Sequence, residues 1–215
     1  MYIGRIVAAG MTRDGRVAAG YRVSSRSFPN RTARLTGDKV SIMPRAGFES
    51  DLSKNPYIAY NCLRLCGKTA LVTNGSQTDP IIEKIIAGMN LRDALALPLL
   101  AMDYEKDSLN TPRIAAAVDA EKGVAMLGIV RHDALLVKEF ALEPGKSYYL
   151  STYEKNAPCK RSCDEAFDAA DADALCAYMI SGGVFADFEK PVTAASALWN
   201  GSGYSLAVAD AKIEA

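Results

Sequence analysis

The hydrophobic positions in the first 73 residues fall into short runs that turn residues separate. These runs are rich in β-branched and aromatic residues, which favour β-strands. The Asp14-Gly15 pair between the first two runs is a strong hairpin signal, and similar glycine-containing pairs join the later runs. We therefore expect strands at residues 2–9, 16–23, 32–36, 40–43, 57–66 and 69–73.

A helical pattern follows these runs. Asp79-Pro80 is typical of an N-cap with proline in the first turn, and it predicts a helix at residues 81–89. A second helix is expected at residues 90–102, where Pro98 should kink or interrupt it. Both helices are apolar on more than one face, which indicates that each packs between a sheet and a neighbour.

Strand-like runs return after the second helix, and one more helix follows them. We expect strands at residues 114–118, 124–130, 134–140 and 147–152. A single apolar stripe that includes Phe167 and Tyr178 predicts a helix from about residue 164 to residue 180. The remaining tail, which contains Trp199, is expected to hold a helix and a last strand.

The order of these elements predicts an α+β fold. A block of strands, two helices, a second block of strands and a helix do not alternate as a parallel α/β protein requires. The order favours a four-layer αββα sandwich, in which two antiparallel sheets pack face to face with helices outside. A chain of 215 residues is expected to form one domain, residues 1–215.

The charges are unevenly distributed, although 25 basic and 25 acidic residues give a net charge of zero. Residues 1–50 hold nine Lys/Arg and three Asp/Glu, whereas residues 164–215 hold two and nine. The arginines lie scattered through apolar strands, without a lysine-rich run or a basic helical face. This favours a small anionic ligand over a nucleic acid.

Neither a membrane nor an export signal is expected. No apolar run approaches the ~20 residues of a membrane span. The first residues lead directly into a strand pattern, so no signal peptide is expected. We therefore predict a cytoplasmic protein. The apolar helices with several faces favour a homo-oligomer.

The five cysteines are expected to be reduced thiols, because their number is odd and no secretion signal precedes them. The pairs Cys62/Cys66 and Cys159/Cys163 lack the two-residue spacing of a zinc knuckle. A four-cysteine zinc site is the alternative, but Cys62 and Cys66 fit better as small core residues. We expect no metal and no cofactor.

Common catalytic motifs are absent from the sequence. The only histidine, His132, lies beside Asp133 in an expected hairpin turn. Without a second histidine, a Ser-His or Cys-His nucleophile has no other base. Neither common phosphate-binding glycine motif occurs.

Polar residues instead cluster at the ends of the expected elements. Residues 21–31, YRVSSRSFPNR, hold three arginines, three serines and an asparagine. Arginine forks and hydroxyl groups bind phosphate or carboxylate. The alternative is a solvated strand end and turn. Residues 60–61, 74–78, 103–107 and 110–113 form similar clusters, each with an ordinary structural interpretation as an interior tyrosine, a helix cap or a solvated charge run.

Six longer blocks carry a specific resemblance: MYIGRIVAAG, YRVSSRSFPNR, NPYIAYNCLRL, VTNGSQTD, GMNLRDALALPLLAMDYEKDSLNTPRIAA and YLSTYE. In this order they resemble the archaeal-type IMP cyclohydrolase family over residues 1 to about 154. The resemblance implies an N-terminal-nucleophile-hydrolase-like αββα fold. The chain starts Met1-Tyr2, so the usual Ser, Thr or Cys nucleophile is not expected.

The resemblance also implies a reaction, the last step of purine synthesis. In that step 5-formamidoimidazole-4-carboxamide ribonucleotide closes its ring and loses water to give IMP. By resemblance, Arg22, Tyr60 and Glu105 occupy catalytic positions. We expect Arg22 to stabilise the oxyanion, Tyr60 to donate to it and Glu105 to take or relay the amide proton. Arg22→Ala and Tyr60→Phe should then lower turnover without unfolding the protein.

The expected substrate contacts are assigned less directly. For the phosphate we favour Ser24, Arg26 and Asn30 or Arg31, with Ser76 and Thr78 as second choices. For the base carboxamide or the ribose hydroxyls the candidates are Asn61, Asn74, Asp103 and Asn110.

Two other functions remain as alternatives. One is a hydrolase that cleaves an amide or cyclic amidine in another nucleotide-like substrate. The other is a non-catalytic nucleotide- or RNA-binding module, which would bind polyanions in a salt-sensitive way without turnover.

Overall fold

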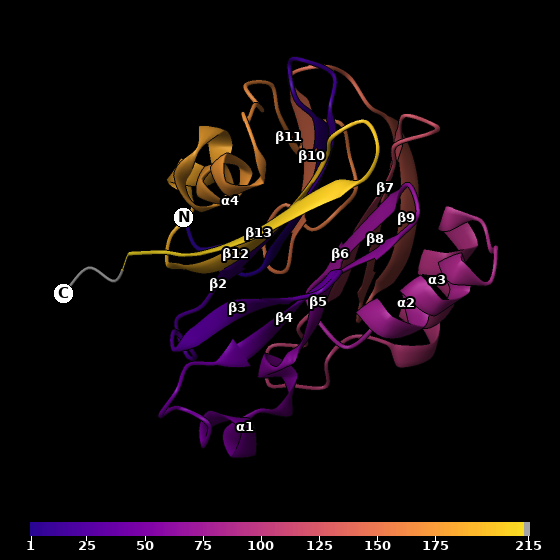
Figure 1. Cartoon of the computed structure of the whole chain (residues 1–215). Helices are drawn as coiled ribbons and strands as arrows, with labels where there is room; N and C mark the ends of the chain where they lie inside the picture. The colour runs from indigo at the N-terminus through magenta and orange to yellow at the C-terminus, as the bar shows by residue number, and fades with distance from the viewer. Residues whose placement is uncertain (213–215) are drawn as a thin grey trace.

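Two antiparallel sheets pack face to face with helices on their outer sides, as Figure 1 shows. The structure is a computed structural model that describes residues 1–212. One sheet has six strands in the order β11-β10-β1-β2-β12-β13, and the other has seven in the order β3-β4-β5-β6-β7-β8-β9. The expected αββα sandwich is confirmed.

The bounds of the elements are as follows. The six-stranded sheet holds β1 (Ile6–Met11), β2 (Val17–Ser24), β10 (Lys146–Ser151), β11 (Cys163–Asp164), β12 (Pro191–Trp199) and β13 (Tyr204–Asp210). The seven-stranded sheet holds β3 (Arg31–Thr36), β4 (Lys39–Pro44), β5 (Tyr60–Cys66), β6 (Thr69–Thr73), β7 (Arg113–Asp119), β8 (Val124–Arg131) and β9 (Ala134–Ala141). The helices are α1 (Asp51–Lys54), η1 (Pro56–Ile58), α2 (Thr78–Ile86), α3 (Leu91–Met102), α4 (Ala172–Ser181) and η2 (Gly183–Asp187).

The alternation of side chains along β2 determines which groups meet between the sheets. Val17, Ala19, Tyr21 and Val23 belong to the core between the two sheets. Successive side chains of a strand point to opposite faces. Arg22 therefore points away from Tyr21, towards the layer of α4.

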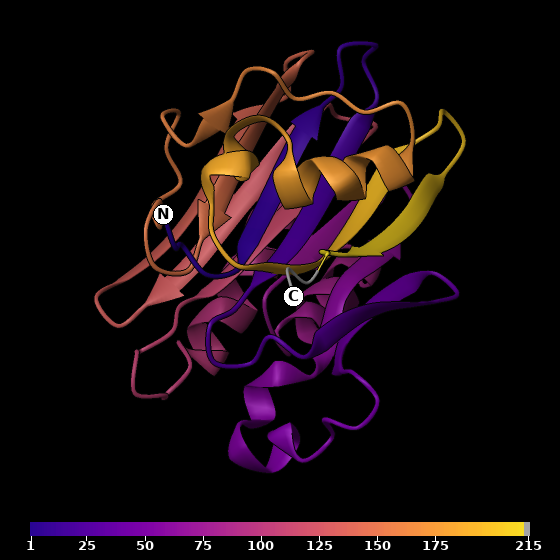
Figure 2. The same cartoon turned by 90° about the vertical axis from the view of Figure 1, so that its left-hand side faces the viewer.

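Each sheet is covered on its outer face by helices. Helix α4 lies across the six-stranded sheet, as Figure 2 shows, and buries Leu175 and Met179. Gly20 of β2 allows this close approach, since a Cβ there would lie 2.6 Å from the sulfur of Met179. Helices α2 and α3 cover the seven-stranded sheet. Pro98 lies within α3, which continues to Met102.

Two expectations for the C-terminal third are wrong. The helix expected from residue 164 begins only at Ala172, because the side chain of Asp171 accepts from the Ala174 amide at 2.7 Å and caps it. The tail holds η2 and two strands rather than a helix and one strand. Strand β12 is buried on both faces and rich in alanine, so it lacks the alternating pattern that reveals a strand.

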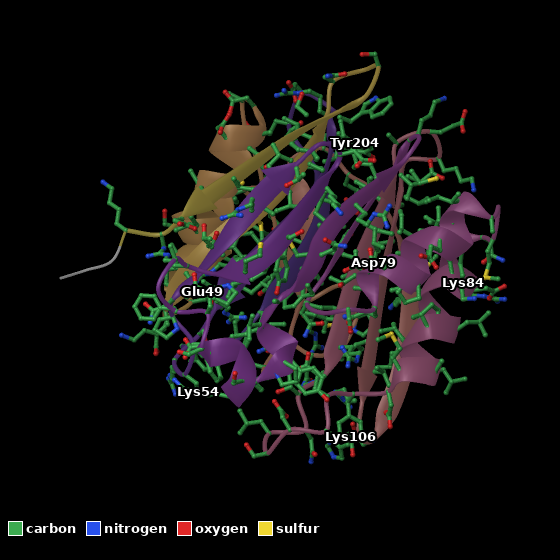
Figure 3. All side chains as sticks on the ribbon, turned by 60° about the horizontal axis from the view of Figure 1, so that its bottom comes forward. Glu49, Lys54, Asp79, Lys84, Lys106 and Tyr204 are labelled. Carbon is green, nitrogen blue, oxygen red and sulfur yellow. The ribbon has the colours of Figure 1, made fainter. Side chains whose placement is uncertain are left out.

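One end of the sandwich gathers loops from distant parts of the chain. The β2–β3 loop, α1 and η1, and the loop from α3 to β7 meet at the lower end of Figure 1. Lys54 and Lys106 lie at this end in Figure 3, and Tyr204 lies at the other. At this end, residues 25–28 and Arg31 of the arginine-rich stretch lie around the same pocket as Glu105.

Candidate functional site

A pocket of about 460 Å³ opens at this end. Its size is that of a small-molecule site. It is lined by Tyr2, Arg5, Ser25, Arg26, Ser27, Phe28, Arg31, Asn55, Tyr57, Ile58, Glu105, Asp107, Ser108, Leu109 and Tyr153.

Three arginines line this pocket at different depths. Arg31 is only 2% exposed, and its Nε donates to the Phe28 carbonyl at 3.1 Å. Arg5 lies just before β1, and its side chain is also largely buried. Arg26 lies at the rim, where it pairs with Glu189 at 3.2 Å and stacks on the Tyr2 ring. The pocket therefore presents positive charge both at its floor and at its mouth.

Glu105 is the buried carboxylate of the pocket, with 1% of its surface exposed. Its backbone amide donates to the Thr111 carbonyl at 2.8 Å, which fixes the loop after α3. Oε2 accepts from Arg5 Nη2 at 3.2 Å. Oε1 has no hydrogen-bond partner within residues 1–212. Burial raises the pKa of Glu105, while Arg5 and Arg113 act in the opposite direction.

Aromatic rings form much of the remaining wall. Tyr2 and Tyr153 stack with their centroids 5.9 Å apart. Phe28 and Tyr57 line the pocket from the β2–β3 loop and from η1. Such rings offer flat apolar surfaces to a planar heterocycle.

Tyr60 lies in the core beside this floor and pairs with Tyr21. Their hydroxyl oxygens are 2.6 Å apart, and both side chains are buried. Burial raises the pKa of Tyr60, and the nearby Arg31 and Arg5 guanidinium groups partly offset this. Tyr60 is therefore a neutral hydroxyl that lies close to both buried arginines.

Arg22 does not line the pocket. Its fully buried guanidinium donates to the carbonyls of Ile180 at 2.9 Å and Phe185 at 2.7 Å, and also to that of Phe188. Its Nε donates to Ser24 Oγ at 3.0 Å. Ser24, which was predicted to contact the phosphate, is therefore also engaged by Arg22. Burial lowers the pKa of Arg22 to about 10. Because side chains alternate along β2, Arg22 points away from the core and joins α4 and η2 to the sheet.

Several predicted substrate contacts lie elsewhere. Asn30 lines a separate surface groove with Arg45. Asn61 accepts from Ser41 and donates to Asp79 at the start of α2, the helix that covers the outer face of the seven-stranded sheet. Asn110 lies beside Pro112 in a smaller pocket.

The predicted residues at the β6–α2 junction are also outside the pocket. Asn74 and Thr78 are fully buried, and their side chains donate to the carbonyls of Pro112 and Gly75. Ser76 is exposed to solvent. The carboxylate of Asp103 pairs with Lys106 at 2.5 Å. Of the predicted set, only Arg26, Arg31 and Glu105 line the pocket, with Tyr60 next to it.

The arrangement combines four chemical capabilities. Arginine forks bind a phosphate or stabilise an oxyanion, and a buried carboxylate with a free oxygen takes a proton. A buried hydroxyl can donate a hydrogen bond, and aromatic walls hold a planar ring. No group of three or more His, Cys, Asp or Glu side chains in the described part of the chain is arranged to hold a metal ion.

Comparison with known proteins assigns the chain to a family. The model of the IMP cyclohydrolase-like protein family matches residues 2–203. The chain belongs to this family. The IMP cyclohydrolase of Methanosphaera stadtmanae is 49% identical over 197 residues, which cover 92% of this chain and 94% of that protein. The enzyme of the same name from Methanocella arvoryzae is 52% identical over 198 residues, 92% of each chain.

A more distant relative covers nearly the whole chain. The IMP cyclohydrolase of Methanocaldococcus jannaschii is 43% identical over 210 residues, 96% of this chain and 98% of that protein. The match to the family model extends to residue 203, beyond the end of the resemblance seen in the sequence blocks at about residue 154.

The sequence prediction missed some pocket residues that lie inside the blocks resembling this family. Arg5 is the only charged residue in the apolar block MYIGRIVAAG, and this isolation could have indicated a buried arginine. Tyr57 and Tyr153 lie in the blocks NPYIAYNCLRL and YLSTYE, but nothing in their local pattern separates a pocket tyrosine from a core one. Ser25 and Ser27 belong to the arginine-rich stretch already singled out.

Proposed function

We propose that this protein is an IMP cyclohydrolase, a cyclic amidine hydrolase that converts 5-formamidoimidazole-4-carboxamide ribonucleotide and IMP into one another. The observation that carries the proposal is the buried Glu105 beside two buried arginines, in a chain whose family match covers residues 2–203. The named relatives support the same reaction.

Ring closure needs two proton transfers and an oxyanion site. The carboxamide nitrogen attacks the formyl carbon, a C–N bond forms, and the formyl oxygen becomes a hydroxyl. That hydroxyl then takes up a second proton and leaves as water, while the former formamide nitrogen loses its hydrogen as a proton and forms the ring C=N bond. Positioning and electrostatic stabilisation supply most of the acceleration in such a step.

We assign these roles to pocket residues. Oε1 of Glu105 takes the carboxamide proton, because it is buried and has no hydrogen bond to lose. Arg31 and Arg5 stabilise the developing oxyanion, the role expected for Arg22 from the sequence. Tyr60 supports them with its neutral hydroxyl, which its raised pKa keeps protonated.

The phosphate belongs at the mouth of the pocket in this proposal. Arg26 offers an exposed fork there, and Ser25 and Ser27 offer hydroxyls on the same loop. The planar imidazole then lies deeper, against Tyr57 and Phe28.

The test is an ultraviolet assay of IMP formation by purified protein. The wild type should form IMP, and Glu105→Gln, which keeps the shape but removes the base, should be slower by roughly 10²–10⁴-fold. Asp79→Asn, on the outer side of the fold, is the matched control and should retain turnover. No IMP formation by folded wild type would refute the proposal and favour the related amide or amidine hydrolase.

Three further expectations belong to the proposal. We propose one domain, since the core between the sheets contains residues from Val7 to Ala197. A homo-oligomer is supported by the exposed Ile86, Leu97 and Leu100 on α2 and α3. A cytoplasmic location remains a prediction, and no helix within residues 1–212 is long and apolar enough to cross a membrane.

A further inference from the structure

Arg113, the first residue of β7, lies directly behind the pocket wall. It is 5% exposed and does not line the pocket itself. Its Nε donates to the Asp103 carbonyl at 2.8 Å, and Nη1 donates to Gln77 Oε1 at 3.1 Å. Nη1 also lies 3.8 Å from Glu105 Oε1. This arginine therefore connects the start of α2, the end of α3 and the carboxylate of the pocket.

A buried amide network keeps Arg113 in this position. Gln77 Nε2 donates to Asn74 Oδ1 at 2.8 Å, and Asn74 Nδ2 donates to the Pro112 carbonyl at 2.9 Å. Asn74 Oδ1 also accepts from the Ile114 amide at 2.8 Å. Asn74 and Gln77 are both fully buried. These bonds fix the orientation of both amides, so Gln77 can only present its oxygen to Arg113.

Gly75 leaves the space that this contact needs. A Cβ at this position would lie 2.6 Å from Gln77 Oε1 and 2.8 Å from Arg113 Nη1. Any side chain at residue 75 would therefore displace the hydrogen bond between Gln77 and Arg113.

The backbone before Glu105 adopts an unfavourable conformation that fits the same arrangement. Asp103 ends α3 with φ 58° and ψ −177°, a region that glycine occupies far more readily than other residues. Its carbonyl is the acceptor for Arg113 Nε, and Glu105 follows two residues later. The contact with Arg113 helps to hold this strained turn, and with it the position of Glu105.

We propose that Arg113 is a positioning residue that holds Glu105 against the pocket and stabilises its negative charge, with Gln77 and Asn74 holding Arg113 in turn. The proposal rests on the role of Glu105 in the proposed function. The 3.8 Å between Arg113 Nη1 and Glu105 Oε1 is longer than a hydrogen bond. Arg113 therefore stabilises the buried carboxylate charge by electrostatic attraction and leaves Oε1 without a hydrogen bond. Arg5 holds the other oxygen, and Oε1 stays free for a substrate proton.

The first measurement is the titration of the Glu105 carboxyl by ¹³C NMR, assigned by the signal lost in Glu105→Gln. Burial raises the pKa of this group and Arg113 opposes the rise, so Arg113→Gln should raise the pKa further. Arg113→Lys keeps the charge and should lie nearer to the wild type. Arg64→Gln removes a partly buried arginine of β5 that pairs with Asp79, and it should leave the titration unchanged.

The second measurement is kcat/KM against pH. In Arg113→Gln the acid limb should move to higher pH, so that the loss of activity is greatest at low pH and is largely recovered at high pH. A merely structural role would lower activity by a similar factor at every pH. If Arg113→Gln fails to fold, Gly75→Ala keeps every charge and should move the carboxyl titration in the same direction.

The outcomes separate the two proposals. An unchanged Glu105 titration in folded Arg113→Gln overturns the role of Arg113, whatever the turnover. A raised pKa in a protein whose wild type forms no IMP supports the role of Arg113 in positioning the carboxylate and refutes only the proposed reaction.

Discussion

Arg22 is expected to stabilise the fold and not to act on the substrate. Replacing it with methionine keeps a long apolar side chain and removes every hydrogen-bond donor. The carbonyls of Ile180, at the end of α4, and Phe188, just after η2, then lose this donor. The Phe185 carbonyl also loses it but still accepts from the Phe188 amide at 3.3 Å. Arg22 is not among the residues that line the pocket at the end of the sandwich, so the substitution leaves the lining unchanged.

The size of the effect follows from these contacts. An orphaned buried acceptor costs about 1–3 kcal/mol, so the two orphaned carbonyls together cost roughly 2–6 kcal/mol. Removing a buried guanidinium recovers part of this cost as desolvation, so we expect a net loss of about 1–4 kcal/mol in the free energy of unfolding. At about 2–4 °C for each kcal/mol in a chain of this size, the melting temperature should fall by roughly 2–16 °C.

Urea unfolding followed by circular dichroism measures this loss, and the IMP assay at a temperature where the variant is folded measures turnover. Arg64→Met is the control, because this arginine is 26% exposed and forms one ion pair with Asp79. It should cost less than about 1 kcal/mol. A loss below about 1 kcal/mol for Arg22→Met, together with turnover reduced more than about 100-fold, would restore Arg22 to the catalytic set.

Two other substitutions test the proposed site. Tyr60→Phe removes the hydroxyl beside Tyr21 and should lower kcat by about 10²-fold with little change in KM, as measured by steady-state kinetics. Tyr204→Phe, at the far end of the fold in Figure 3, is the control. Equal rates in both variants would exclude a role for the Tyr60 hydroxyl. Arg26→Ala should raise KM by about tenfold with kcat nearly unchanged, as expected for a lost phosphate contact at the pocket mouth. Arg92→Ala, an exposed arginine of α3, should leave KM unaltered, and an unchanged KM in Arg26→Ala would place the phosphate elsewhere.

Local chemistry in the sequence was enough to predict most of the elements. Gly-containing turns separate β1 from β2 and β5 from β6, and the apolar runs between them match the observed strands within a few residues. Strand β6 begins and ends where the pattern predicted it, at residues 69–73. These features depend on turn geometry and on neighbours along the chain, which a sequence contains directly.

The composition of the pocket depends on contacts that no local pattern records. Glu105 comes from the loop after α3, Arg5 from before β1 and Arg31 from β3, and the sheet order brings them together. Arg113 was part of a polar cluster in the sequence, but its role appears only when Gln77 and Glu105 lie on either side of it.

The sequence by itself determined the family, the αββα layering and the stretch of arginines around residues 21–31. Only the tertiary structure decided between the arginines of that stretch. Arg22 and Arg31 have the same chemistry and similar surroundings in the sequence, yet one anchors α4 and the other lines the pocket. The physical reason is that the two arginines lie on strands of different sheets. Side chains alternate along β2, so Arg22 points away from the core between the sheets and towards α4, whereas Arg31 begins β3 of the other sheet and lines the pocket. Only the packing of the two sheets decides which of these side chains meets the pocket.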